Sequence, residues 1–113
     1  MSKRDDLIEK YAAALKDKAG VTVDMDLLRK VTIGCGPSIY NKDSSTISAN
    51  DPAEMDRVRQ NFLIKKLGLK DGPKLEEGLT AVIEQYGKSD RNKYRAAIYY
   101  LLTKHFKKEK VYS

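Results

Sequence analysis

A long polar segment, from Gly34 to Asn50, interrupts a chain whose other parts have the periodicity of helices. Its sequence, GCGPSIYNKDSSTISAN, consists mostly of residues that favour turns and irregular backbone. Compact domains rarely contain so long a connection unless it is functional or disordered. The fold must therefore arrange helices around one long polar loop, and that loop is the first place to look for a functional site.

Apolar residues recur at helical spacing on both sides of this segment, which predicts five helices. Ser2, Asp24 and Ser89 are in position to cap the first, second and last of them. The five predicted helices cover about residues 3–18, 24–33, 52–67, 73–86 and 89–106. A further single helical turn is expected over residues 37–40, because proline fits the first position of a helix.

The third helix has the clearest start signal, Asp51-Pro52-Ala53-Glu54. Asp51 can cap the helix, Pro52 suits its first position, and Glu54 can reach back to complete a capping box. The gap 87–89 between the last two helices is short, so we expect them to form an antiparallel pair.

These patterns predict an all-α fold, a compact single-domain bundle of about five helices with the polar loop between helices 2 and 3. The domain should span residues 1–113, with a frayed tail at 107–113. A chain of 113 residues can bury a core without disulfides or metals. The centre of that core is predicted from the apolar stripes of three helices: Phe62, Leu63, Leu79, Ile83, Ile98 and Leu102.

The composition narrows the setting in which the protein works. Cys35 is the single cysteine, so no internal disulfide can form, which suits a reducing cytoplasm. The first ten residues lack the apolar stretch of a secretory signal, and no apolar run approaches the length of a membrane span. We therefore expect a cytoplasmic protein with no membrane partner, and the sequence has no pattern typical of a cofactor site.

The net charge of +6 is distributed unevenly along the chain. Residues 1–56 contain 8 Lys and Arg against 10 Asp and Glu, whereas residues 57–113 contain 14 against 6. The halves therefore carry −2 and +8. Such asymmetry indicates either an anionic partner for the C-terminal half or pairing between the two halves.

A cluster of cations in the C-terminal half is the first candidate site. It lies where the last helix is expected to begin, a place where the helix dipole disfavours positive charge. Free backbone N–H groups, a capping hydroxyl and several cations could hold a phosphate or a carboxylate there. The alternative is that these cations pair with acids elsewhere in the fold. The candidate anion-binding residues are Lys88, Ser89, Arg91, Lys93 and Arg95.

The polar segment and the helix start after it supply the second set of candidates. Their acids would be drawn to the basic cluster, so we expect the segment to pack over residues 88–95. Oxygen-bearing side chains at 43–46, 51 and 54 invite a calcium or magnesium interpretation, but their spacing does not match an EF-hand loop. No metal site is predicted, since one histidine and one cysteine cannot form a zinc site. The candidates are Tyr40, Asn41, Asp43, Asp51 and Glu54.

Two further motifs favour structural over chemical interpretations. Cys35, in Gly-Cys-Gly-Pro before a possible helix start, could be a reactive thiol, but a small buried residue explains it better. Residues 75–102 could form a helix-turn-helix around Gly87, but bulky Ile83 and charged Lys88 stand where that motif needs a small and an apolar residue.

Three blocks of the sequence together resemble a family of small bacterial proteins known only as a domain of unknown function. The blocks are GPSIYNKDSS, DPAEMDRVRQNFLIKKLGL and YGKSDRNKYRAAIYYLL, and they cover most of residues 36–102. The resemblance implies a bacterial, cytoplasmic, stand-alone domain. It implies no activity, cofactor or catalytic residue.

We expect a non-enzymatic helical binding or interaction module whose basic C-terminal half recognises an anionic protein surface or a phosphate ligand. A nucleic-acid-binding protein is the first alternative, and it would bind less tightly as salt rises. An enzyme that acts through the 34–50 segment is the second, although the sequence offers no converging set of titratable groups.

Overall fold

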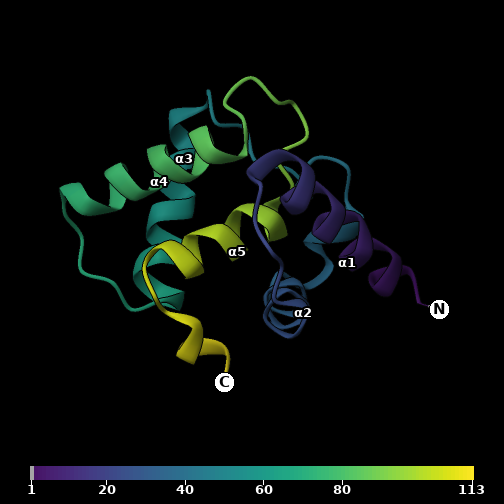
Figure 1. Ribbon diagram of the computed structural model, residues 1–113. Helices are drawn as coiled ribbons and strands as arrows, with labels where there is room; N and C mark the ends of the chain where they lie inside the picture. Colours follow the sequence, from purple (N-terminus) through teal and green to yellow (C-terminus); the bar gives the residue numbers. More distant parts are fainter. Residues whose placement is uncertain (1) are drawn as a thin grey trace.

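The computed structural model describes residues 2–113, and Figure 1 shows how its helices are arranged. This part of the chain is helical and contains no strand, with one isolated bridge between Thr46 and Tyr94. The all-α fold with five principal helices is therefore confirmed. The α-helices are α1 (Lys3–Ala14), α2 (Met25–Gly34), α3 (Pro52–Arg57), α4 (Pro73–Tyr86) and α5 (Arg95–His105).

Two of these helices continue in wider π-helical turns. α1 passes into η1 (Leu15–Ala19) and α3 into η3 (Val58–Lys66), so both reach nearly the lengths that the apolar periodicity predicts. The 3-10 turn η2 (Gly36–Tyr40) contains Pro37, as expected. Within residues 2–113, no helix is both long and apolar enough to cross a bilayer.

The side-chain caps at three helix starts are confirmed. Ser2, Asp24 and Asp51 each accept a hydrogen bond from a backbone N–H in the first turn that follows, at 3.0–3.1 Å. The capping box at Glu54 is wrong, because the Glu54 carboxylate turns to Arg57 and Arg95 instead. A stronger tertiary partner therefore displaces a local bond at this residue.

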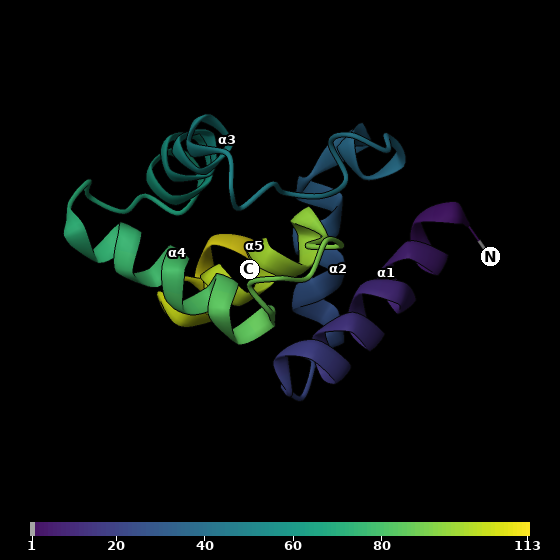
Figure 2. The same ribbon diagram turned by 90° about the horizontal axis from the view of Figure 1, so that it is seen from above.

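Helix α5 forms the centre of the molecule. Figure 2 shows it between α4 on one side and α2 on the other, with α1 beyond α2. Seven of its eleven residues are buried, so water reaches little of this helix. The six residues predicted at the centre of the core are all buried, with exposures from 0 to 6 %.

The start of α5 differs from the prediction. The helix begins at Arg95, with Tyr94 as N-cap, and Ser89 forms no cap. Residues 87–94 are therefore an eight-residue loop rather than a tight turn. Within it, the Asp90 carboxylate accepts a hydrogen bond from the Asn92 N–H at 2.7 Å. This local bond offers the backbone an alternative to helix, which explains the late start.

The C-terminal tail is also more structured than expected. Instead of fraying, Glu109–Tyr112 form a 3-10 turn, η4, which packs against α2. The Tyr112 ring is partly buried against the core, and its edge approaches Gly34. The Tyr112 side chain thus holds the tail against the body of the protein. The polar composition of residues 107–113 does not indicate this contact.

Candidate functional site

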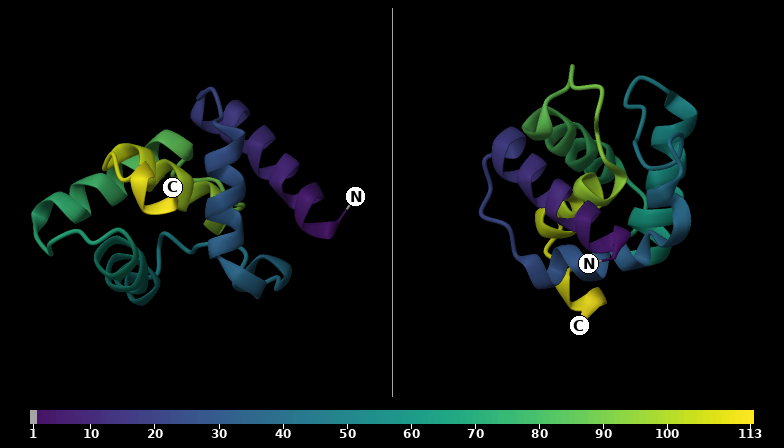
Figure 3. Two further views of the ribbon diagram at one scale, coloured as in Figure 1. Left: turned by 90° about the horizontal axis from the view of Figure 1, so that it is seen from below. Right: turned by 90° about the vertical axis from the view of Figure 1, so that its right-hand side faces the viewer.

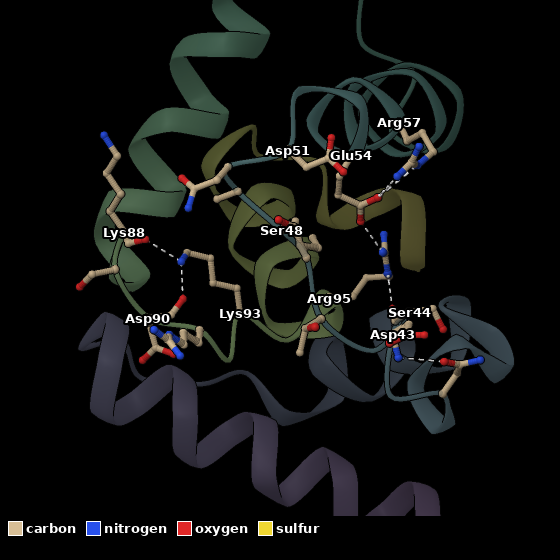
Figure 4. Close-up of a pocket in the computed structure, with 17 residues that line it drawn as sticks. Asp43, Ser44, Ser48, Asp51, Glu54, Arg57, Lys88, Asp90, Lys93 and Arg95 are labelled. Carbon is tan, nitrogen blue, oxygen red and sulfur yellow. Dashed lines mark hydrogen bonds and ion pairs between the residues drawn. The ribbon is translucent and has the colours of Figure 1, made fainter.

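A polar groove of about 740 Å³ lies between the loop that precedes α3 and the loop that precedes α5. Figure 3 (right) shows these loops at the same end of the molecule, and Figure 4 shows the side chains that line the groove. It brings together nine of the ten candidate residues from the sequence. Tyr40 is the candidate that does not line the groove. The candidates that do are Asn41, Asp43, Asp51, Glu54, Lys88, Ser89, Arg91, Lys93 and Arg95.

Backbone pairing between the two loops builds this groove. The Ile47 N–H donates to the Lys93 carbonyl at 2.8 Å, and the Arg95 N–H donates to the Ser45 carbonyl at 2.8 Å. The expectation that the polar segment packs over residues 88–95 is confirmed. The expected cause, pairing of acids with the basic cluster, holds for Glu54, which pairs with Arg95. Main-chain hydrogen bonds and the buried Ile47 side chain make the rest of the contact, rather than Asp43 or Asp51.

An ion-pair network of Arg95, Glu54 and Arg57 lies on one side of the groove, across from Lys88 and Lys93 in Figure 4. Arg95 donates from Nη2 to Glu54 Oε1 at 2.5 Å, from Nε to the Ser44 carbonyl at 2.8 Å, and from Nη1 to the Tyr99 hydroxyl at 3.0 Å. Arg57 donates to the other oxygen, Glu54 Oε2, at 2.7 Å. Burial opposes ionisation of Glu54, but the bonds from the two arginines outweigh it, so its pKa is lowered.

Lys93 holds the loop before α5 together from the inside. Its side chain is buried, with the residue only 5 % exposed, and its ammonium donates to the carbonyl oxygens of Lys88, at 2.7 Å, and Asp90. Burial lowers the pKa of Lys93, while Asp90 acts against that shift. Lys93 is therefore a structural cation and is not available to a ligand.

Asp90 connects the same loop to the first helical segment. Its carboxylate lies 2.8 Å from the ammonium of Lys18, which is also within 5.3 Å of the Tyr86 ring centroid. The pKa of Asp90 is lowered first by the hydrogen bond from Lys18 and then by that from the Asn92 N–H. The net charges of the two halves suggest pairs between an acid of residues 1–56 and a cation of residues 57–113. This pair is the reverse, because its cation, Lys18, lies in the first half and its acid, Asp90, in the second.

Two cations of the groove remain without such partners. Lys88 and Arg91 are exposed, and within residues 2–113 neither side chain forms a hydrogen bond or an ion pair. Ser89, between them, is also exposed and forms no side-chain hydrogen bond in the described chain. The basic cluster is thus divided into two structural cations, Lys93 and Arg95, and two accessible ones.

The candidates from the polar segment have mainly local roles. Asn41 accepts a hydrogen bond from the Asp43 N–H at 2.8 Å, and Asp51 caps α3. Tyr40 lies outside the groove, with the Lys3 ammonium 5.7 Å from its ring centroid. Two partners were missed: Arg57 and Asp90. Their spacing was the signal that could have identified them: Arg57 lies three residues after Glu54, and Asp90 lies three residues before Lys93.

The charges of the groove are nearly balanced. Five cations line it, with four carboxylates, and the two carboxylates with resolved shifts, Glu54 and Asp90, have lowered pKa values. A general base or acid works best with a pKa close to the operating pH. The groove is therefore better suited to binding charged groups than to proton transfer.

The remaining sequence motifs have structural explanations. Cys35 is half-buried, and burial raises the pKa of its thiol to about 11, with Arg95 opposing the shift, so it is not poised as a thiolate. The helix-turn-helix interpretation is wrong, because eight residues separate α4 from α5 and because α5 is buried. Within residues 2–113, no three His, Cys, Asp or Glu side chains gather closely enough to hold a metal ion.

Residues 10–110 match the model of a protein family described as "Protein of unknown function (DUF2853)". The match covers most of the chain, so the chain belongs to this family. None of the curated proteins compared with the chain matches it. The family supplies no activity, and the chemistry of the groove must support any functional conclusion.

Proposed function

We propose that this member of the DUF2853 family is a non-enzymatic binding module that recognises an anionic group, such as a phosphate or a carboxylate, through Lys88 and Arg91. The observation that carries the proposal is that, within residues 2–113, these two cations have no side-chain partner in a groove where the other cations are paired. Exposed charges without partners cost the fold nothing to present to a ligand.

The rigid surroundings of the two cations support this proposal. Lys93 ties the loop to itself through the carbonyls of Lys88 and Asp90. Arg95, where the loop enters α5, holds it to the body of the protein through the Ser44 carbonyl and Glu54. A loop that is ordered before binding loses less conformational entropy when a ligand arrives. Arg57, with a 59 % exposed side chain, could add a third cation at the opposite wall.

The nearly balanced charge of the groove favours a small anion or an acidic protein surface over nucleic acid. A nucleic-acid site usually presents a strip of cations without interspersed acids, because each phosphate contact displaces a counterion. Here Asp43 and Asp51 are exposed at the same groove and would repel a polyphosphate backbone.

Titration followed by amide NMR shifts tests the proposal, with phosphoserine and an acidic peptide as probes. We expect shifts that concentrate at residues 87–95 and disappear in Arg91→Glu and Lys88→Glu. Lys74→Glu is the matched control, since it makes the same charge change at an exposed lysine outside the groove. Unchanged spectra with both probes, or equal loss of binding in Lys74→Glu, would contradict the proposal.

An oligonucleotide titration distinguishes the proposed function from nucleic-acid binding, which is the main alternative. Binding that is tighter than that of phosphoserine and that weakens steeply with salt would replace the proposed function with nucleic-acid binding.

We also infer that the protein works in the cytoplasm of a bacterium. The free thiol of Cys35 and the resemblance to small bacterial proteins support this setting. Immunoblots of fractionated cells check it, and a secreted or periplasmic protein would contradict it.

A further inference from the structure

A second pocket, of about 380 Å³, adjoins the groove. Arg95 and Ser44 line both spaces, but the second pocket is otherwise built by different elements: the end of α2, η2, η3, α5 and the C-terminal turn η4. Its size is in the range of small-molecule sites. The lining residues are Gly34, Cys35, Ser38, Ser44, Asn61, Phe62, Lys66, Arg95, Tyr99 and Tyr112.

The chemistry of this pocket differs from that of the groove. No aspartate or glutamate is among its lining residues, whereas Lys66 and Arg95 bring two positive charges. The Lys66 ammonium forms no ion pair within residues 2–113 and lies 5.0 Å from the centroid of the Tyr112 ring. The thiol of Cys35 stays protonated near neutral pH, because burial raises its pKa to about 11. The polar side of the pocket therefore favours an anion.

Aromatic rings form the apolar side of the pocket. The Tyr99 ring stacks on Phe62, with centroids 3.8 Å apart and an angle of 12° between the planes. Tyr112 adds a third ring from the tail. Burial raises the pKa of the Tyr112 hydroxyl, so it remains an O–H donor at neutral pH. Such walls suit a flat, apolar ligand body.

The tail that supplies Tyr112 packs on α2 through η4, but two features at its start favour its release. Lys107, where the tail leaves α5, has a φ of 56°, and it is the one residue other than glycine with positive φ in the described chain. Such a conformation is unfavourable for a side-chain-bearing residue. The ion pair between Lys104 and Glu109, at 3.6 Å, is exposed and contributes little.

We propose that this pocket binds a small planar aromatic carboxylate, whose ring packs against Tyr99 and Tyr112 and whose carboxylate pairs with Lys66. The C-terminal segment 107–113 acts as a lid that opens to admit it. The site does not depend on the anion-binding groove, because Lys88 and Arg91 do not line it.

Cys35 provides a direct assay, since it is the single thiol of the chain and lines the pocket. The rate of its alkylation by N-ethylmaleimide, followed by mass spectrometry, is measured with benzoate, with benzamide and with sodium chloride at equal ionic strength. We expect benzoate to slow alkylation severalfold and the neutral isostere benzamide to leave the rate unchanged. Equal protection by both, or by neither, would overturn the proposal.

Lys66→Gln should abolish the protection by benzoate. Lys65→Gln is the matched control, because Lys65 is exposed and adjacent in sequence but does not line the pocket. Protection that survives in Lys66→Gln, or that is lost equally in Lys65→Gln, would overturn the assignment of Lys66. Because both lysines are exposed, neither change should unfold the protein.

The lid is tested with Tyr112→Ala, which should raise the alkylation rate without ligand. A thermal melt of the same variant distinguishes an open lid from unfolding. A folded variant with an unchanged alkylation rate would show that Tyr112 does not control access.

Discussion

The basic cluster at residues 88–95 contains two kinds of cation that the sequence does not distinguish. Lys93 and Arg95 point into the protein and bind backbone carbonyls, Tyr99 and Glu54. Lys88 and Arg91 remain exposed and unpaired within residues 2–113. The comparison shows that a run of positive charges is not one functional unit. Its buried members stabilise the fold, whereas its exposed members remain accessible to a ligand.

The largest effect should come from Arg95→Met, which breaks the ion pair between Arg95 and Glu54. We expect a loss of about 3 kcal/mol in the free energy of unfolding, since Glu54 would keep a buried charge with only Arg57 as partner. Urea denaturation measures the loss. The double variant Glu54→Gln/Arg95→Met should lose less than the sum of the single changes. Simple additivity would mean that Arg95 and Glu54 contribute independently.

A substitution in the core gives a reference for the loss of stability expected from Arg95→Met. Ile98 lies fully buried in α5, and Ile98→Ala should cost about 2–4 kcal/mol by leaving a cavity. The same denaturation experiment applies. A cost below about 0.5 kcal/mol would mean that Ile98 does not pack in the core as described.

Lys93→Met keeps the apolar stem of the side chain and removes its ammonium. Two carbonyls in the loop would lose their donor, so we expect a loss of about 1–3 kcal/mol. Lys88→Met is the control, and its stability should stay within about 0.5 kcal/mol of wild type. Equal effects of the two changes would remove the distinction between structural and accessible cations.

Acid should weaken the ion-pair network at Glu54. The pKa of Glu54 in the folded protein is below its ordinary value of 4.5, so the unfolded chain binds its proton more readily. The stability that this group adds is present above about pH 4.5 and is lost as the pH falls through the lowered pKa. Unfolding measured between pH 7 and 3 should therefore show less acid destabilisation in Glu54→Gln than in wild type. An identical pH dependence would contradict the pKa assignment.

The smallest effect on stability should come from Arg91→Glu. Arg91 is exposed and lies four residues before α5, so neither an ion pair nor the helix dipole couples its charge to folding. We expect a midpoint of thermal unfolding close to that of wild type, together with loss of phosphoserine binding. A marked drop in the midpoint would place Arg91 with the structural cations and would remove the basis of the proposed function.

Local chemistry explains why much of the fold was predictable. Helical periodicity identified α1 to α4, and the caps at Ser2, Asp24 and Asp51 need only neighbours in sequence. The start of α5 was missed because an Asp90 turn and the Lys93 ammonium stabilise the preceding loop. The anchoring of the tail was missed because it depends on the packing of η4, with Tyr112, against α2, which is distant in sequence.

By itself, the sequence determined the all-α class, the predicted core residues and the two polar segments that form the groove. Each of these follows from the spacing or type of residues close together in the chain. Only the tertiary structure decided that Glu54 leaves its capping role for Arg95, 41 residues away, and that Lys93 turns inward. The physical reason is that the partners and burial of a charge depend on segments distant in sequence, and these set the balance between desolvation and pairing.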